Sequence, residues 1–135
     1  NVRFNEMEYH LPAEVGIKAL REIKETIEKH FSEAFFPIEC RFIKAEEAWL
    51  SPFYQRDSVS IAVHRYFEED YQPMFSALEP IFQKYGGRPH WGKLNTFTKE
   101  QFKAAYPNWS NFSKIRKELD PKGKFMNTYL SSLFS

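Results

Sequence analysis

Apolar and polar residues follow a short period in several segments of the first two thirds of the chain. Residues 2–11 and 58–67 alternate roughly at every second position, and residues 35–45 are rich in β-forming side chains. Alternation of this kind is typical of strands, because successive side chains point to opposite faces of a sheet. A short fourth strand is predicted within residues 89–95.

Two other segments repeat apolar residues every three or four positions, which predicts helices. The first begins at Pro12 and carries apolar residues as far as Phe31, and the second spans residues 71–85. Gly86 and Gly87 follow the second helix directly. Glycine commonly ends helices, so the chain is expected to change direction there.

The predicted order of elements is strand, helix, strand, strand, helix, strand. This order is typical of the ferredoxin-like fold, so we expect an α+β domain with an antiparallel sheet and both helices on one face. Three short helices are predicted to follow, over residues 98–107, 108–121 and 126–134, the first capped by Thr98. The chain has no repeats or long linkers, so residues 1–135 are expected to form a single domain.

Charge and cysteine content narrow the function classes. The 135 residues carry 19 Lys and Arg against 18 Asp and Glu, which gives no broad basic surface for nucleic acid or membrane. The single cysteine, Cys40, excludes an internal disulfide and favours a reducing, cytoplasmic location. No signal peptide or membrane-spanning run is recognisable, although membrane association of a full-length protein stays open. The chain begins without Met and is expected to be a piece of a longer protein.

The second strand carries Glu39 and Arg41 two positions apart, so both point to the same face of the sheet. We expect the helices to cover the other face, which carries Ile38, Cys40 and Phe42. A carboxylate and a guanidinium would then lie together on the open face. A solvated surface pair that contributes little is the alternative, and the spacing alone favours it.

The third strand carries His64, which is expected on the same open face if the second and third strands are antiparallel neighbours. Its alternation is regular: Val59, Ile61 and Val63 are predicted to face the helices, while Ser58, Ser60, Ala62 and His64 face away. A lone histidine in a strand is more often structural than catalytic.

The stretch "GGRPHWGKLN" (86–95) places cations and rings beside glycines. Alternation predicts one face with Arg88, His90, Gly92 and Leu94 and another with Trp91, Lys93 and Asn95. Trp91 could fill a core edge with the charged groups at its rim. Alternatively, Gly92 gives a flat ligand room and Lys93 meets an anion or oxygen.

Two other kinds of site find little support in the sequence. Glu39, Cys40, His64 and His90 are possible zinc ligands, but they lack metal-ligand spacing, so no metal is expected. The ferredoxin-like fold also binds RNA through stacked aromatic residues, yet the open face predicted here has no aromatic pair. Nucleic acid is therefore not expected, although a free-standing RNA- or protein-binding module remains an alternative.

Several motifs together resemble one enzyme family. They are "EMEYHLP" (6–12), "ECRFIKAEEAWLSPFYQRDSV" (39–59), "RPHWGK" (88–93), "AYP" (105–107) and "LDPKGKFMNTYL" (119–130). In order and approximate spacing they resemble the FAD-linked sugar-1,4-lactone oxidases, which act on arabinono-, gulono- and galactono-lactones and are related to the alditol oxidases. The resemblance spans nearly the whole chain.

The resemblance implies that the chain is the C-terminal substrate, or cap, domain of a flavoenzyme of the vanillyl-alcohol oxidase type. The N-terminal FAD-binding half would be absent, so the fragment alone is expected to be inactive. The full-length enzyme would transfer a hydride from a CH–OH group of an aldono-1,4-lactone to flavin. The expected partners are a sugar lactone or polyol and the FAD-binding domain.

The resemblance also assigns roles to residues. Glu39 and Arg41 match a pair that binds substrate hydroxyls over the flavin, and Lys93 matches a lysine near both substrate and flavin. Together these three are the implied catalytic residues. His90 would contact the flavin, and His64 would contact the substrate.

One position departs from the relatives. The His-x-Thr pair of the alditol oxidases falls on Ala62 and His64, which favours a lactone over an alditol as substrate. Either Glu39 or neutral His64 could act as the base that removes the hydroxyl proton.

Overall fold

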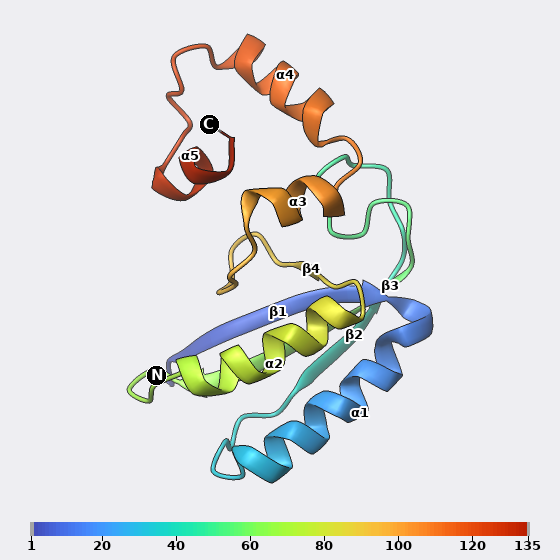
Figure 1. Ribbon diagram of the computed structural model, residues 1–135, viewed down its shortest axis with the longest axis vertical. Helices are drawn as coiled ribbons and strands as arrows, with labels where there is room; N and C mark the ends of the chain where they lie inside the picture. Colours follow the sequence, from blue (N-terminus) through green and yellow to red (C-terminus); the bar gives the residue numbers. More distant parts are fainter. Residues whose placement is uncertain (1, 135) are drawn as a thin grey trace.

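Four antiparallel strands form the sheet in the computed structural model, which describes residues 2–134. They are β1 (Phe4–Pro12), β2 (Glu39–Ile43), β3 (Ser58–Tyr66) and β4 (Arg88–Pro89), arranged in the order β2-β3-β1-β4 (Figure 1). The two longest strands, β1 and β3, lie in the middle. The prediction of an α+β fold with an antiparallel sheet is therefore confirmed.

Helices α1 (Ala13–His30) and α2 (Gln72–Lys84) cover one face of this sheet (Figure 1). The core between them consists of apolar side chains from every second position of β1 and β3 and from the inner sides of the helices: Met7, Tyr9, Leu11, Ala19, Ile23, Val59, Ile61, Val63, Met74, Phe75, Leu78, Ile81 and Phe82. The predicted inward facing of Val59, Ile61 and Val63 is confirmed. Helix α1 approaches β3 closely at Gly16, where an added Cβ would lie 2.6 Å from Val59 Cβ.

Strand β2 is the outer strand and is shorter than the predicted residues 35–45. Cys40 and Phe42 are paired with Ile61 and Val59, so they do point to the helix side. The prediction that the helices cover this face is right for Ile38, which packs against the core, but wrong for Cys40, which is exposed, and for Phe42, which is 71% exposed. The two helices pack over the central strands and leave this edge bare.

Three further helices, α3 (Lys99–Ala105), α4 (Trp109–Leu119) and α5 (Thr128–Phe134), gather beyond one edge of the sheet (Figure 1). We call this group the helical lobe. Its core is aromatic and consists of Phe102, Tyr106, Trp109, Leu133 and Phe134. Thr98 caps α3 through a reciprocal capping box with Gln101, as the sequence predicted for Thr98. Phe97 packs against both cores and so joins the lobe to the sheet.

The end of α2 matches the prediction, because the helix stops at Lys84 and Gly86 adopts a φ of 68°. Gly87 then leads into β4. A Cβ added to Gly87 would lie 2.8 Å from the carbonyl oxygen of Phe82. Close backbone approach therefore requires glycine here.

The predicted fourth strand over residues 89–95 is wrong beyond Pro89, because two extra residues loop out of the ladder. His90 N–H donates to Glu8 O at 2.9 Å, and Leu94 N–H donates to Glu6 O at 3.0 Å. In a regular antiparallel pair, residues bonded to Glu8 and Glu6 would be two apart rather than four. A turn closed by Lys93 N–H on His90 O fills the gap.

This turn also overturns the predicted alternation of faces. Alternation places His90 on one face and Trp91 and Lys93 on the other, yet all three line the same hollow. A turn does not preserve the two-residue period of a strand. Within residues 2–134, no helix is long and apolar enough to cross a membrane.

Candidate functional site

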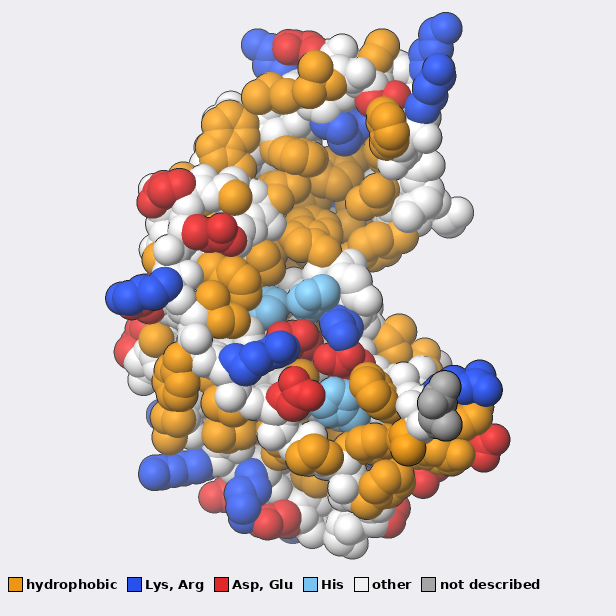
Figure 2. Space-filling view, turned by 180° about the vertical axis from the view of Figure 1, so that it is seen from behind, with side chains coloured by type: hydrophobic (Ala, Val, Ile, Leu, Met, Phe, Trp, Pro, Cys, Tyr) orange, Lys and Arg blue, Asp and Glu red, His pale blue; other side chains and the backbone are white. Residues whose placement is uncertain are grey.

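The sheet face away from α1 and α2 forms the floor of a hollow with a volume of about 570 Å³. Figure 2 shows histidine, acidic and basic side chains gathered in it, below the apolar surface of the helical lobe. The hollow is lined by all five residues singled out from the sequence: Glu39, Arg41, His64, His90 and Lys93. The predicted sharing of one sheet face by Glu39, Arg41 and His64 is present in the structure, and the turn after β4 brings His90 and Lys93 to the same hollow.

The strand register explains this convergence. Glu39 of β2 is paired with Ala62 of β3, which is paired in turn with Glu8 of β1. The next row, two residues along, contains Arg41, Ser60 and His10. Side chains within such a row share one face, so three strands contribute to the same floor.

Glu8 is the main counterion of Arg41. Arg41 Nη2 lies 2.7 Å from Glu8 Oε1 but 3.9 Å from Glu39 Oε2. The Glu8 side chain is 4% exposed, whereas that of Glu39 is 52% exposed. A charge-assisted hydrogen bond to a buried acceptor is stronger than a long contact in solvent. Glu8 therefore holds the guanidinium, while Glu39 stays available at the rim.

Glu6 links two further site residues. Its carboxylate pairs with the ammonium group of Lys93, and its other oxygen lies 3.6 Å from His64 Nε2. His64 Nδ1 lies 3.3 Å from the carbonyl oxygen of Pro37. Both ring nitrogens of His64 therefore face oxygen acceptors, Nδ1 the Pro37 carbonyl and Nε2 the Glu6 carboxylate.

Three further residues of the hollow, Glu6, Glu8 and His10, were not predicted from the sequence. The signal was present, because they alternate in "EMEYHL" with Met7, Tyr9 and Leu11, the buried positions of β1. A central strand with three titratable side chains at every second position indicates a polar surface under cover. The prediction of this strand rested on its apolar residues only.

His10 is the most deeply buried of the three. Its side chain is 2% exposed, its Nδ1 lies 2.5 Å from Ser60 Oγ, and the Phe53 ring contacts it edge-on with centroids 4.8 Å apart. Burial, reinforced by the positive charges of neighbouring groups, lowers the pKa of His10 to about 3. His10 is therefore neutral near pH 7, and among the described residues its Nε2 has no hydrogen-bond partner.

His90 lies on the turn after β4. Its Nδ1 accepts a hydrogen bond from Gly92 N–H at 3.0 Å, so the neutral ring carries its proton on Nε2 and can donate from there. A Cβ on Gly92 would meet only the His90 ring, at 3.5 Å. The idea that Gly92 makes room for a ligand stays a prediction.

Two half-buried arginines hold the loop beside the hollow. Arg88 donates to the carbonyl oxygens of Pro52 and Tyr54, both at 3.1 Å, and Arg56 donates to His10 O at 2.6 Å. Burial, followed by the nearby charge of Arg88, lowers the pKa of Arg56 to about 10. Both arginines therefore stay charged near neutral pH and hold the loop that carries Phe53 over the end of the sheet.

The set of groups suits an uncharged polar ligand with several hydroxyls. Carboxylates accept hydrogen bonds, Arg41, Lys93 and His90 donate them, and the opposite charges in the hollow largely balance. Within residues 2–134, no cluster of His, Cys, Asp and Glu could hold a metal ion. Cys40 in particular points to the opposite face of the sheet from Glu39 and His64.

Comparison with known proteins places this site in context. Residues 1–133 match the D-arabinono-1,4-lactone oxidase family. The chain is 41% identical over 128 residues to the L-gulono-1,4-lactone dehydrogenase of Mycobacterium tuberculosis (95% of this chain, 30% of the relative). It is 38% identical over 132 residues to the L-gulonolactone oxidase of Mus musculus (94% and 30%) and 34% identical over 129 residues to the alditol oxidase of a Streptomyces species (93% and 30%).

Proposed function

Because the chain belongs to the D-arabinono-1,4-lactone oxidase family, we propose that it is the substrate-binding cap domain of an FAD-dependent enzyme that oxidises a CH–OH group of an aldono-1,4-lactone. The family resemblance of the motifs is confirmed by this match. The observation that carries the functional proposal is the convergence of Glu39, Arg41, His64, His90 and Lys93 in one hollow.

The chain spans 30% of the length of these relatives, so we place the FAD-binding part elsewhere in a longer protein. We treat residues 1–135 as one ferredoxin-like domain extended by the helical lobe. The strand order β2-β3-β1-β4 and the contacts of Phe97 with both cores support this view. The single cysteine supports a cytoplasmic location.

The donors along one wall of the hollow fit a flavin. Lys93 and His90 lie on the same turn, and both can donate toward the electron-rich edge of an isoalloxazine ring. When bound, FAD supplies the hydride acceptor. The chain's own task would be to hold the lactone against that ring and to manage the hydroxyl proton.

Arg41 and Glu39 would orient the lactone hydroxyls, one as donor and the other as acceptor. Glu8 keeps the Arg41 guanidinium in place, which matters because catalytic groups work only when they are preorganised. Of the two candidate bases, Glu39 is the more exposed, whereas His64 Nε2 faces Glu6. The two variants Glu39→Gln and His64→Gln distinguish these candidates. In the plot of kcat/KM against pH, the acidic limb should disappear in the variant that lacks the base.

The proposal is tested with the full-length, flavin-loaded protein. Anaerobic mixing with D-arabinono-, L-gulono- or galactono-1,4-lactone should bleach the flavin absorbance, a readout that needs no knowledge of the electron acceptor. Arg41→Ala or Lys93→Ala should slow reduction by about 10²-fold or more, as expected for loss of a preorganised charge. Lys44→Ala is the matched control, because Lys44 is 90% exposed and lies outside the hollow. Wild-type reduction rates in both site variants would refute the assignment.

An alditol is the second candidate substrate, because the Streptomyces alditol oxidase is 34% identical to the chain. Ala62 and His64 argue against it, since the alditol oxidase pattern there is His-x-Thr. The same bleaching assay with xylitol and sorbitol separates the two classes. Faster reduction by an alditol than by every lactone would reverse the order of the candidates.

A further inference from the structure

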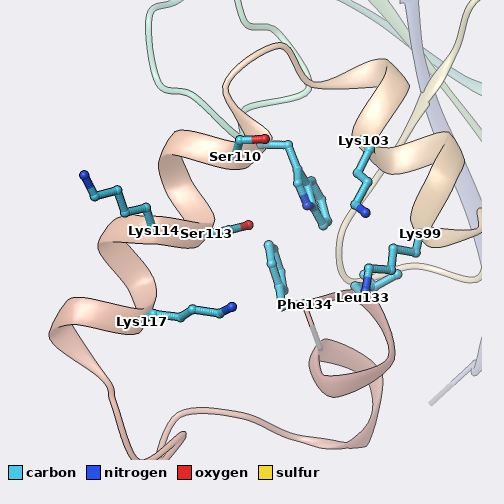
Figure 3. Close-up of a pocket in the computed structure, with 9 residues that line it drawn as sticks. Lys99, Lys103, Ser110, Ser113, Lys114, Lys117, Leu133 and Phe134 are labelled. Atoms are coloured by element: carbon cyan, nitrogen blue, oxygen red, sulfur yellow. The ribbon is translucent and has the colours of Figure 1, made fainter.

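A second pocket lies in the helical lobe and shares no lining residue with the hollow on the sheet. It lies between α3 and α4, with α5 on a third side, and has a volume of about 460 Å³ (Figure 3). Its apolar part is formed by Trp109, Leu133 and Phe134. The Trp109 and Phe134 rings stack with centroids 4.4 Å apart and planes 6° from parallel.

Two helices line this pocket with cations and hydroxyls. Lys99 and Lys103 are one turn apart on α3, and Lys117 and Ser113 are about one turn apart on α4. Figure 3 shows the Lys103 and Lys117 side chains reaching into the pocket from opposite sides, with the Ser113 hydroxyl on the same side as Lys117 and the Phe134 side chain between the two helices. Ser110, also in the lining, lies in the first turn of α4, where the helix dipole adds partial positive charge.

No acidic residue of the described chain lines the pocket. Within residues 2–134, neither Lys103 nor Lys117 has an ion pair, whereas Lys24, Lys84 and Lys93 are each paired with a glutamate. Like charges facing each other across a pocket repel. An anion that bridges the two helices would replace that repulsion with attraction on both sides.

We propose that this pocket binds an organic phosphate, with the phosphate groups between Lys103 and Lys117 and the organic part against Trp109 and Phe134. Lysine is a common phosphate ligand, and the Ser110 and Ser113 hydroxyls can donate to further oxygens. The volume falls in the range of small-molecule sites, about 300–1,000 Å³. The inference is independent of the proposed oxidase function, because the two sites have no residue in common.

The pocket differs from the sheet hollow in a way that separates their ligands. The hollow mixes carboxylates with cations and suits neutral hydroxyls, whereas the charged residues that line this pocket are all cations. A neutral lactone gains little from ammonium groups alone. A di-anionic phosphate gains several charge-assisted hydrogen bonds.

The test is isothermal titration calorimetry on the full-length protein with its flavin bound, so that any dinucleotide site is filled. The probes are inorganic pyrophosphate, for the anionic part alone, and ADP, for anion and organic part together. Both should bind with one-to-one stoichiometry, and ADP should bind more tightly. The double variant Lys103→Gln/Lys117→Gln should weaken both by about tenfold or more, through loss of two charge-assisted contacts.

Lys122→Gln is the matched control, because Lys122 is exposed in the same lobe and does not line the pocket. The control substitution should change the affinity for either probe by no more than about twofold. Neither the control nor the double variant should alter flavin reduction by the lactone, because substitutions of exposed lysines are not expected to affect folding. The proposal is overturned if neither probe binds saturably, or if the double variant binds as tightly as the Lys122 control. If the wild-type protein binds both phosphate probes but oxidises no lactone, only the proposed oxidase function is refuted.

Discussion

Glu8→Gln should loosen Arg41 and so weaken both the fold and the site. The substitution keeps the size of the side chain and an acceptor oxygen, but removes the charge that faces Arg41 Nη2 at 2.7 Å. The Glu8 side chain is 4% exposed and that of Arg41 is 55% exposed. The contact is therefore shielded from solvent on the Glu8 side and open to solvent on the Arg41 side.

The magnitude follows from these exposures. A hydrogen bond to a charged group contributes about 1.5–3 kcal/mol, and a half-exposed guanidinium places this one at the lower end, about 1.5 kcal/mol. Glu39→Gln removes a second carboxylate from the same guanidinium, but that contact is 3.9 Å long and half exposed. It should cost less than about 0.5 kcal/mol, as usual for surface pairs.

The two variants are compared by urea unfolding of the full-length protein, with flavin reduction measured in parallel. Glu8→Gln should lower the unfolding free energy and slow reduction. In a background that already carries Arg41→Gln, the same Glu8→Gln substitution should lose most of its effect on stability. That double-mutant cycle isolates the contact from other effects of the substitution.

A Glu39→Gln variant that is destabilised as much as Glu8→Gln would contradict this prediction. That result would mean that Glu39 at the rim of the hollow, and not Glu8 on β1, holds the Arg41 guanidinium in place. Additivity of Glu8→Gln and Arg41→Gln would refute it equally, because the two side chains would then act independently.

Three further outcomes are expected. The lowered pKa of His10, about 3 against 6.5 unfolded, means that only the unfolded state takes up its proton between these values. Stability should therefore fall as pH drops from 6.5 toward 3, and His10→Gln should flatten that slope in unfolding curves; an unchanged slope would contradict the burial argument. Gly16→Ala should cost about 1–3 kcal/mol by calorimetry, because its Cβ would lie 2.6 Å from Val59 Cβ, whereas Gly92→Ala should be nearly neutral. Thr98→Ala should cost about 1 kcal/mol through loss of the cap on α3, and an unchanged melting temperature would refute that role.

Much of the fold could be predicted because local signals agreed with the final packing. The alternation in β3 and the helical spacing in α1 and α2 reflect burial against a single core, and Thr98 marks the start of α3. The two-residue period also placed Glu39, Arg41 and His64 on the open face. These features depend only on the geometry of a strand or a helix.

Features set by distant partners could not be predicted in the same way. The alternation of side chains along β2 places Phe42 on the helix side of the sheet. No local signal in the sequence shows that the helices do not reach this outer strand. The turn after Pro89 interrupts the alternation of faces in "HWGK". The hydrogen bonds that flank this turn go to Glu8 and Glu6, some eighty residues earlier in the chain. The alternation in β1 could have placed Glu6 and Glu8 on the open face, but their pairing with Lys93 and Arg41 depends on contacts between distant segments.

The row Glu39–Ala62–Glu8 has a consequence for how the floor of the hollow could change by substitution. Its middle member contributes only a methyl group between two carboxylates, and Ala62 is 1% exposed. A histidine at this position would bring an imidazole into the centre of the floor. Here the imidazole stands at His64, two residues or about 7 Å further along β3. The chemistry of the floor could thus change through one or two substitutions on a central strand while the pairs Arg41–Glu8 and Lys93–Glu6 are kept.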